Sequence, residues 1–307
     1  MSLINYARLA TRTLLLKLRK INSSTVGDYN AASSTYDEYY SRYLGSGAST
    51  LLSRLPVRPG MTIIDLACGT GFFTHYIAEA VSPTGRVFAV DLSPGMLTRN
   101  REKAAERGLA NIEFVEGDAT AWLESLPESS VDGLICGWGI CYMDHVKLRA
   151  HAERLLRPGG FLGLIENRAN TLSAVSSIFE KVLSRYPQAL IKNMDIHLPK
   201  DHQYLVKAFA KGQIECVESW DGDICVPCAT GLEVAEYMLR SGASAGFIDA
   251  LDPTMTDTVM TEFVNRVDLE FREKGGFPVK HEYCALLGRH RAVPHVATDA
   301  TAQQVAA

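Results

Sequence analysis

The chain has 307 residues, a formal net charge of −4 and a hydrophobic share of 47%. This length suffices for one α/β domain with an added cap, and no apolar run approaches the length of a membrane span. Nucleic-acid-binding proteins usually carry a basic footprint, so a polynucleotide partner is disfavoured. The seven cysteines, an odd number without a secretory signal pattern, indicate a reducing compartment, and we expect a cytoplasmic protein.

Residues 1–21 predict an amphipathic basic helix. Apolar residues recur there at helical spacing, and the stretch has no acidic residue. Its cations are Arg8, Arg12, Lys17, Arg19 and Lys20. Three interpretations stand side by side: packing on the core or on a second subunit of a homodimer, peripheral contact with a membrane surface, and a removable transit peptide.

Residues 26–45 are rich in tyrosine. Tyr36 and Tyr40 lie one helical turn apart, as do Tyr39 and Tyr43, and Tyr29 precedes them. These rings would cover a sheet edge and keep their hydroxyls in water. The glycines at 45 and 47 mark a candidate hinge.

The stretch 62–73 predicts a strand, a glycine bend and the start of a helix. Ile63, Ile64 and Leu66 form a short apolar run with β-branched residues, which is typical of a strand buried on both faces of a parallel sheet. Gly69 and Gly71 break this strand, and a helix is expected from Phe72 to Ala80. Free N–H groups at such a helix start, beside glycines that allow close approach, form a cradle for a polar ligand.

The next predicted strand, 85–91, ends in Asp91, about 20 residues after the glycines. An acid in this place can accept hydrogen bonds from a ribose diol. Dinucleotide-binding sites have a third glycine where this chain has Thr74, so the sequence disfavours NAD as the ligand. Ser93 and Pro94 then predict a helix start, with Ser93 as the N-cap and Pro94 at the first helical position.

A third unit, 111–119, is a strand that ends in Gly117, Asp118 and Ala119. Asp118 is therefore a second acid at the same edge of the sheet, and it is equally suited to cap the helix that follows. Further strands are expected at 131–138 and 161–166, with residues 155–160 closing the helix between them.

Taken in order, these signals resemble a class I S-adenosylmethionine (SAM) methyltransferase of the ubiquinone/menaquinone-biosynthesis type, over roughly residues 25–170. The resemblance implies an α/β, Rossmann-like sheet of seven mostly parallel strands, with helices on both faces and a last antiparallel strand between strands five and six. It also implies an N-terminal helical lid and a helical cap. The expected organisation is residues 1–55 for the N-terminal helices and lid, 56–169 for the SAM-binding core, 170–280 for sheet completion and cap, 281–290 for the last strand, and 291–307 for a disordered tail.

The resemblance also implies SAM as cofactor, with S-adenosylhomocysteine as product. Asp91 would bind the ribose, Asp118 the exocyclic adenine amine, and Leu92 and Met96 would flank the adenine ring. Tyr29 and Tyr36 are the expected lid contacts, since aromatic faces suit a sulfonium. The remaining expected cofactor-binding residues are Asp65, Ala67, Cys68, Gly69, Gly71, Gly117, Ala119 and Gly137.

The segment 138–145 follows strand four, where loops at the carboxyl ends of strands carry specificity. The catalytic candidates are Tyr142, His145 and Glu166. His145 could serve as a general base or an orienting group, or be an exposed residue in the first turn of the next helix. Many members of the family have a histidine where Cys141 stands, so the sequence confirms no familiar base.

Beyond residue 170 the chain predicts helices at 174–186, 200–211, 233–240 and 259–274, a sixth strand at 213–220 and a last strand at 277–288. The inserted helices resemble the cap of small-molecule members, which encloses an apolar or amphipathic substrate. Leu239, Phe247, Met260 and Phe263 are cap-lining candidates, or ordinary core residues.

The expected function is methyl transfer from SAM to a small apolar or amphipathic acceptor, such as a quinone, phenol, isoprenoid or lipid-like molecule. The alternatives are a SAM-binding regulatory or partner protein without methylation activity, and a metalloid or thiol S-methyltransferase using Cys136, Cys141, Cys225 and Cys228. No metal site is expected, because Cys225 and Cys228 lack the further ligands of a structural zinc.

Overall fold

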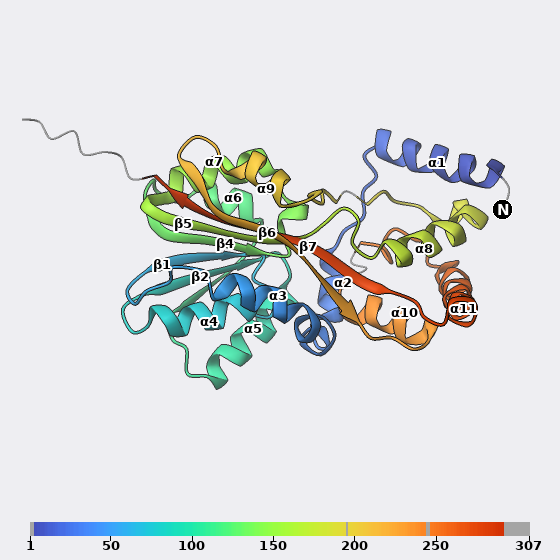
Figure 1. Cartoon of the computed structure of the whole chain (residues 1–307), viewed down its shortest axis with the longest axis horizontal. Coiled ribbons are helices and arrows are strands. Elements are labelled where there is room, and N and C mark those ends of the chain that lie inside the picture. Colours follow the sequence, from blue (N-terminus) through green and yellow to red (C-terminus); the bar gives the residue numbers. More distant parts are fainter. Residues whose placement is uncertain (1–2, 195, 244–245, 292–307) are drawn as a thin grey trace, which may run out of the picture.

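The computed structural model describes residues 3–194, 196–243 and 246–291. A single sheet of seven strands runs through it in the order β3-β2-β1-β4-β5-β7-β6 (Figure 1). The strands are β1 (Thr62–Leu66), β2 (Arg86–Asp91), β3 (Ile112–Glu116), β4 (Val131–Gly137), β5 (Leu156–Asn167), β6 (Ile214–Val226) and β7 (Val279–His290). Only β7 is antiparallel, and it lies between β5 and β6. The predicted α/β, Rossmann-like fold class is confirmed.

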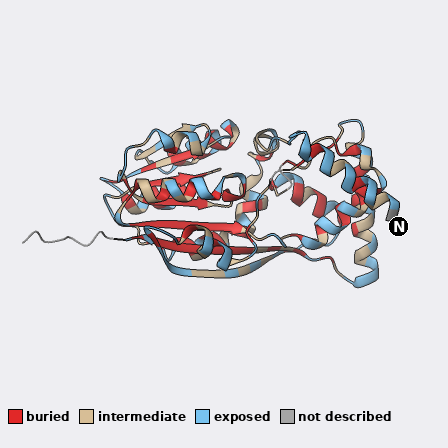
Figure 2. Cartoon of the chain, turned by 90° about the horizontal axis from the view of Figure 1, so that it is seen from above, coloured by how far each residue is buried: buried red, intermediate tan, exposed pale blue. Residues whose placement is uncertain are grey.

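Helices cover both faces of the sheet, and the strands between them are largely buried (Figure 2). One face carries α3 (Arg42–Leu52), α4 (Phe72–Val81) and α5 (Pro94–Glu106). The other face carries α6 (Ala119–Glu124), α7 (His145–Leu155) and α9 (His202–Phe209). Two apolar clusters, one on each face, enclose β1, β4 and β5, as the continuous apolar pattern of these strands requires.

Side-chain caps start the helices that follow β2 and β3. Ser93 Oγ accepts a hydrogen bond from the Met96 N–H at 3.2 Å, and Pro94 takes the first position of α5. Asp118 caps α6 by accepting from the Ala121 N–H at 2.8 Å. The predicted helix start at Ser93 is thus confirmed. Asp118 caps the next helix, which was the alternative to a role in ligand binding.

A separate group of helices forms the cap at one end of the long axis of the molecule (Figure 1). It consists of α8 (Ser173–Arg185), α10 (Gly231–Arg240) and α11 (Thr256–Lys274), with α1 (Leu3–Leu18) packed on α8. The cap has its own apolar cluster, which includes Val182, Val234, Val259, Phe263 and Val267. The predicted helices 174–186, 233–240 and 259–274 correspond to α8, α10 and α11 within a few residues.

Short helical segments connect the cap and the core. α2 (Val26–Ala32) and a π-helical turn, η1 (Asp37–Ser41), form the tyrosine-rich segment, and 3₁₀ turns occur at η2 (Ile140–Tyr142) and η3 (Pro187–Ala189). None of the helices within the described ranges combines the length and apolarity needed to cross a membrane.

Two local expectations are wrong. The candidate hinge at Gly45 and Gly47 is the interior of α3, where a Cβ at Gly45 would lie 3.1 Å from the Phe72 ring and one at Gly47 would lie 3.2 Å from the Tyr283 ring. Close packing, rather than hinge motion, accounts for these glycines. Residues 156–160 belong to β5 instead of closing the preceding helix, and the β4–β5 register shifts between Val131 and Gly133.

The expected disordered tail, residues 292–307, lies outside the described residues.

A buried chain of hydrogen bonds joins the cap, the sheet and the tyrosine-rich segment. The Tyr237 hydroxyl of α10 lies 2.6 Å from His281 Nε2 on β7, and His281 Nδ1 lies 3.0 Å from Asn167 Oδ1 on β5. Asn167 Nδ2 donates onward to the Tyr40 hydroxyl at 3.2 Å. Because Asn167 Oδ1 can only accept, His281 is protonated at Nδ1 and accepts from Tyr237 at Nε2. Burial lowers the pKa of His281 to about 3, so its ring stays neutral.

We expect Tyr237→Phe to lower the free energy of unfolding by about 1–3 kcal/mol, because it leaves the buried His281 Nε2 without a donor. The measurement is urea denaturation followed by circular dichroism. The matched control is Tyr76→Phe on α4, because Tyr76 is 46% exposed and the loss of its hydroxyl should change stability little. Equal stabilities of the two variants would contradict the importance of the buried chain.

Candidate active site

The bend after β1 is held by the carboxylate of Asp91 at the end of β2. Asp91 Oδ2 accepts from the Gly69 N–H and Oδ1 from the Ser93 N–H, both at 2.8 Å. Burial raises the pKa of Asp91, although these two N–H donors oppose the shift. Gly69 has φ +53° and an added Cβ there would meet no atom within 4 Å, so the bend borders open space. The acid therefore connects the loops after β1 and β2 on one side of a cavity.

Asp65 lies behind the bend rather than at the cavity. It is 1% exposed, and its Oδ2 accepts from Thr74 Oγ1 at 2.5 Å in the first turns of α4. Burial raises the pKa of Asp65 to about 7. Thr74, which stands where dinucleotide sites have a third glycine, thus joins α4 to β1.

Gly71 and Cys68 pack against Asn100 rather than line the cavity. Gly71 has φ +95°, and a Cβ there would lie 2.4 Å from Asn100 Oδ1, so only glycine fits this start of α4. Cys68 is buried and lies 3.5 Å from the Asn100 amide nitrogen, which donates to its sulfur. Neither residue lines the main cavity.

The tyrosine-rich segment is tied to the core by two polar residues that sequence reasoning missed. Asn30 Oδ1 accepts from Ser93 Oγ at 2.6 Å and from the Gly95 N–H at 2.9 Å. Asp37 accepts from Thr70 Oγ1 at 2.5 Å and from Lys103 Nζ at 2.7 Å. No sequence signal singles them out, because several other polar residues also lie between the tyrosines.

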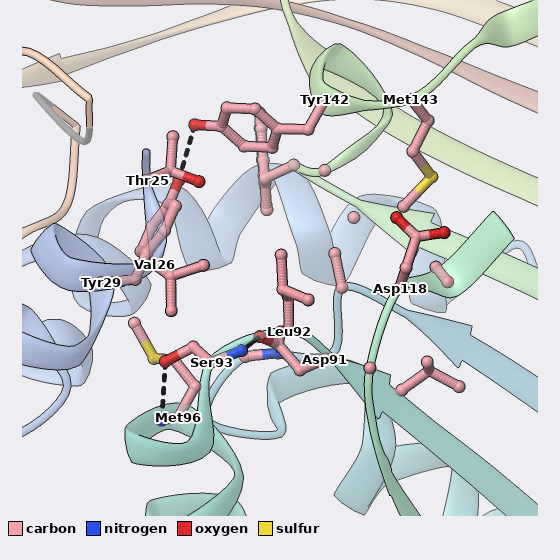
Figure 3. A pocket seen from close by; sticks show the side chains of 18 of the residues that line it. Thr25, Val26, Tyr29, Asp91, Leu92, Ser93, Met96, Asp118, Tyr142 and Met143 are labelled. Carbon is pink, nitrogen blue, oxygen red and sulfur yellow. Dashed lines mark hydrogen bonds between the residues drawn. The ribbon is translucent and has the colours of Figure 1, made fainter. Parts of the chain in front are cut away.

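A cavity of about 150 Å³ opens between the bend, the ends of β2, β3 and β4, and α2 (Figure 3). It collects most of the expected cofactor-binding residues: Tyr29, Tyr36, Ala67, Gly69, Asp91, Leu92, Met96, Gly117, Asp118, Ala119 and Gly137. We call it the donor pocket. Asp65, Cys68 and Gly71 lie outside its lining.

The donor pocket has further lining residues that were not among the expected cofactor-binding residues, chiefly Thr25, Val26, Trp138, Gly139 and Met143. The last three belong to the segment 138–145, which was expected to face the substrate. Trp138 follows β4 with φ +62°, and Ala67 follows β1 with φ +52°. Non-glycine residues in this conformation are uncommon and cluster at functional sites. A Cβ at Gly139 would lie 2.4 Å from Ala67 Cβ, so the two strand ends approach closely at the pocket wall.

Tyr142 joins the donor pocket to a second cavity. Its hydroxyl lies 2.9 Å from that of Tyr29, the two rings meeting edge-on, and the pair closes one side of the pocket (Figure 3). The second cavity, of about 310 Å³, lies among the cap helices and is largely apolar; we call it the cap pocket. Tyr142 lines both cavities. The candidates Leu239, Phe247, Met260 and Phe263 all line the cap pocket.

The other two catalytic candidates are engaged by the protein itself. His145 is 9% exposed, with Nε2 at 2.9 Å from the Ile140 carbonyl oxygen and Nδ1 at 2.9 Å from the Tyr204 hydroxyl. Burial lowers its pKa. His145 begins α7, as its alternative interpretation had it, but it is buried there rather than exposed.

Glu166 is 1% exposed and accepts from the N–H groups of Cys141 at 3.1 Å and Asn167 at 2.8 Å. Burial raises its pKa to about 7. Neither Glu166 nor His145 lines the donor or cap pocket, and both hold the segment 140–142 in place.

The cysteines do not form one cluster. Cys136 and Cys141 are buried near the end of β4, whereas Cys225 and Cys228 lie at the end of β6 beside Phe277. Across the part of the chain that the structure describes, no three His, Cys, Asp or Glu side chains gather as metal ligands would. The metalloid alternative therefore gains no geometric support.

Comparison with known proteins agrees with this geometry. A family model described as a methyltransferase domain matches residues 63–160. A demethylmenaquinone methyltransferase of Lactococcus lactis subsp. lactis is 31% identical over 199 residues, which is 62% of this chain and 77% of that protein. One from Geobacillus stearothermophilus is 30% identical over 42% of this chain, and the match spans only 55% of that protein.

Among solved structures, a methyltransferase-like protein of Bacillus halodurans superposes with a TM-score of 0.55 at 17% identity, covering 81% of this chain and all of that one. This likeness supports the fold. The chain belongs to the class I SAM-dependent methyltransferases of the ubiquinone/menaquinone type.

Proposed function

We propose that this methyltransferase holds SAM in the donor pocket and transfers its methyl group to a small apolar or amphipathic acceptor in the cap pocket. The observation that carries the proposal is that Tyr142 lines both cavities, so a donor in one and an acceptor in the other meet at one side chain. An acceptor in the cap pocket would be surrounded mainly by aliphatic and aromatic side chains.

The residues of the donor pocket fit SAM. Open space at Gly69 and Gly117, where added Cβ atoms would meet nothing within 4 Å, leaves room for a ligand against the backbone. Asp91 and Asp118 supply acceptors for ribose hydroxyls and an adenine amine, and each carboxylate retains lone pairs beyond its backbone contacts. Leu92 and Met96 supply apolar surface for the adenine ring, and we assign the ammonium to the Gly137 carbonyl.

The tyrosines suit the sulfonium end. Tyr29, Tyr36 and Tyr142 lie within one aromatic group, with Tyr29 centred 6.3 Å from Tyr36 and 6.2 Å from Tyr142. Desolvation raises the pKa of each well above the usual value, so all three stay neutral phenols. Their ring faces can stabilise a cation without forming a salt bridge.

When bound, SAM supplies an electrophilic methyl group on a sulfonium that is a good leaving group. The chain's own contribution is therefore mainly orientation, which can supply about 7–11 kcal/mol of the barrier. A positioned base typically adds 10²–10⁴-fold, roughly 3–5 kcal/mol. Since His145 and Glu166 are both engaged by protein atoms, we assign Tyr142 to orienting the acceptor through its hydroxyl.

The alternative of a SAM-binding protein without methylation activity rests on Cys141, which replaces the family's histidine. Cys141 is buried and lines neither the donor nor the cap pocket. A screen of quinones, phenols, isoprenoids and lipid-like molecules with labelled SAM separates the two functions. Label transfer to any of them supports the enzyme, and tight SAM binding with no transfer supports the alternative.

Asp91→Ala should weaken SAM binding at least tenfold, because it removes a half-buried carboxylate that accepts from the ribose and also holds the bend. Isothermal titration with SAM, S-adenosylhomocysteine and NADH measures the effect, and NADH should give no binding to the parent protein. Glu116→Gln is the matched control, since Glu116 pairs with Asp91 in the β2–β3 register but does not line the pocket. A folded Asp91→Ala variant with unchanged affinity would overturn the cofactor assignment.

Met260→Trp should fill part of the cap pocket and raise the KM for the acceptor identified in the screen about tenfold or more, while leaving SAM affinity unchanged. Leu269→Trp is the control on the same helix, because Leu269 is 46% exposed and lines neither pocket. Initial rates of label transfer give the KM for the acceptor, and isothermal titration gives the SAM affinity. If the two variants behave alike, the acceptor does not bind in the cap pocket.

Glu166→Gln tests the structural role of this carboxyl through pH. A carboxyl whose pKa rises from 4.5 to about 7 binds its proton more tightly in the folded than in the unfolded state. The parent protein should therefore lose stability relative to the variant as the pH rises from 4.5 to 7, by on the order of 3 kcal/mol, with no further change above pH 7. Urea denaturation across this range measures the difference, and parallel pH profiles of the two proteins would refute a buried, proton-holding Glu166.

A further inference from the structure

The helix α1 has two apolar sides, and only one of them is covered. Leu9 and Leu16 are buried and belong to the apolar cluster of the cap, which includes Phe179 and Leu183 of α8. Arg12 Nε donates to the Leu190 carbonyl oxygen, and the Asn193 N–H donates to the Ile21 carbonyl oxygen at 2.7 Å. These contacts attach α1 to the cap in one orientation.

The opposite side of α1 presents apolar side chains to the outside. Leu14 and Leu18 lie one turn apart and are 56% and 70% exposed, and Leu15 beside them is 47% exposed. Five of the fourteen large apolar side chains that are exposed in the described chain fall within residues 4–21. These five are Ile4, Leu14, Leu15, Leu18 and Ile21. Scattered exposed apolar residues are ordinary, but four of them on α1, with Ile21 just beyond its end, mark an interaction surface.

Cations border this apolar side. Arg8, Lys17, Arg19 and Lys20 are exposed, and the ion pairs among the described residues involve none of them. The first acidic residue of the chain is Asp28, although the whole chain has a net charge of −4. Leucines flanked by lysine and arginine on an exposed helix are the pattern of a helix that lies in an anionic lipid surface.

A groove runs beneath the same helix toward the cap pocket. This groove, of about 550 Å³, is lined by Leu9, Thr13 and Leu14 of α1 and by side chains of α8. Four residues, Ser176, Phe179, Met194 and Phe247, line both the groove and the cap pocket. Figure 1 shows α1 on the outer side of the cap, over α8. Donor pocket, cap pocket and groove thus follow one another from the sheet to α1.

We infer that the exposed side of α1 docks on an anionic lipid bilayer. The leucines enter the interface and Arg8, Lys17, Arg19 and Lys20 meet lipid phosphates and acidic headgroups. Leu14 and Lys17 are exposed and also line the groove, so this orientation puts that edge of the groove next to the membrane surface. There an acceptor with an apolar chain can pass from the lipid past Phe179 and Phe247 into the cap pocket. The docking surface stands on α1 itself, whereas the route for the acceptor rests on the proposed function.

Co-sedimentation of the full chain with phosphatidylcholine vesicles, with and without phosphatidylglycerol, tests the docking. We expect binding only to the anionic vesicles, weakened by salt. Leu15→Gln with Leu18→Gln should reduce it at least tenfold, and Arg8→Gln with Arg19→Gln about as much, since each cation contributes roughly fivefold. None of these four residues lines a pocket described above.

Matched controls place the same changes elsewhere on the surface. Leu232→Gln with Leu269→Gln changes leucines that are 60% and 46% exposed on α10 and α11, and Arg86→Gln with Arg107→Gln removes two exposed cations of the core. Control variants should bind vesicles as the parent does. Absence of vesicle binding, or equal losses in test and control variants, overturns the docking.

Light scattering tests the alternative that a second copy of the chain, rather than a membrane, covers this surface. A dimer that dissociates on Leu15→Gln with Leu18→Gln would assign the exposed side of α1 to a second copy of the chain and overturn the membrane proposal. The Asp91→Ala variant keeps the two proposals separate. If it binds vesicles as the parent does and its SAM affinity is also unchanged, the proposed function is refuted and the docking stands.

Discussion

The architecture of the site depends on one half-buried carboxylate. Asp91 receives the Gly69 N–H from the loop after β1 and the Ser93 N–H from the loop after β2, each at 2.8 Å. Removing a carboxylate from water is costly unless its oxygens are hydrogen-bonded, so this arrangement is stable only while both loops keep their conformations. The same constraint turns Gly69, Leu92 and Ser93 toward one cavity, and it explains why a single acid at a strand end organises two loops.

A second constraint brings the tyrosine-rich segment and the cap against this core. Asn30 and Asp37 tie the segment to the loops at Ser93 and Thr70, while the chain Tyr237, His281, Asn167 and Tyr40 links α10, β7, β5 and η1. These bonds are buried or partly buried, and leaving any partner unpaired is unfavourable. The segment is thus fixed to core and cap at once, and Tyr29 is held where its hydroxyl meets that of Tyr142.

The succession of cavities follows from this packing. A compact donor pocket with both polar and apolar lining lies at the strand ends, an apolar pocket lies among the cap helices, and an apolar groove lies under α1. Tyr142 stands at the first junction, and the edge-on pair Phe179 and Phe247, with ring centres 4.5 Å apart, stands at the second. The polarity of the cavities changes in the order that a polar donor and an apolar acceptor require.

The amino-acid sequence alone determined the features that depend on neighbours in the chain. The apolar runs at 63–66 and 131–137, the bend at Gly69, the cap at Ser93 and the helices of the cap could all be predicted, because strand and helix periodicity and turn chemistry are local. Their order along the chain was also enough to indicate the sheet topology and the family. Most residues of the donor pocket followed, since the carboxyl ends of parallel strands meet at one edge.

Only the tertiary structure decided what distant residues do to one another. Gly45 and Gly47 look like a hinge by composition, but the rings of Phe72 and Tyr283 pack against them inside a helix. His145 and Glu166 are plausible bases by residue type, but Tyr204, Ile140, Cys141 and Asn167 occupy their polar atoms. Likewise no local pattern distinguishes the covered side of α1 from the exposed one, because both are apolar and only contact with α8 separates them. Many hydrogen-bond partners and packing neighbours are tens to hundreds of residues apart in the sequence. They come together only in the folded chain, so local sequence periodicity does not predict them.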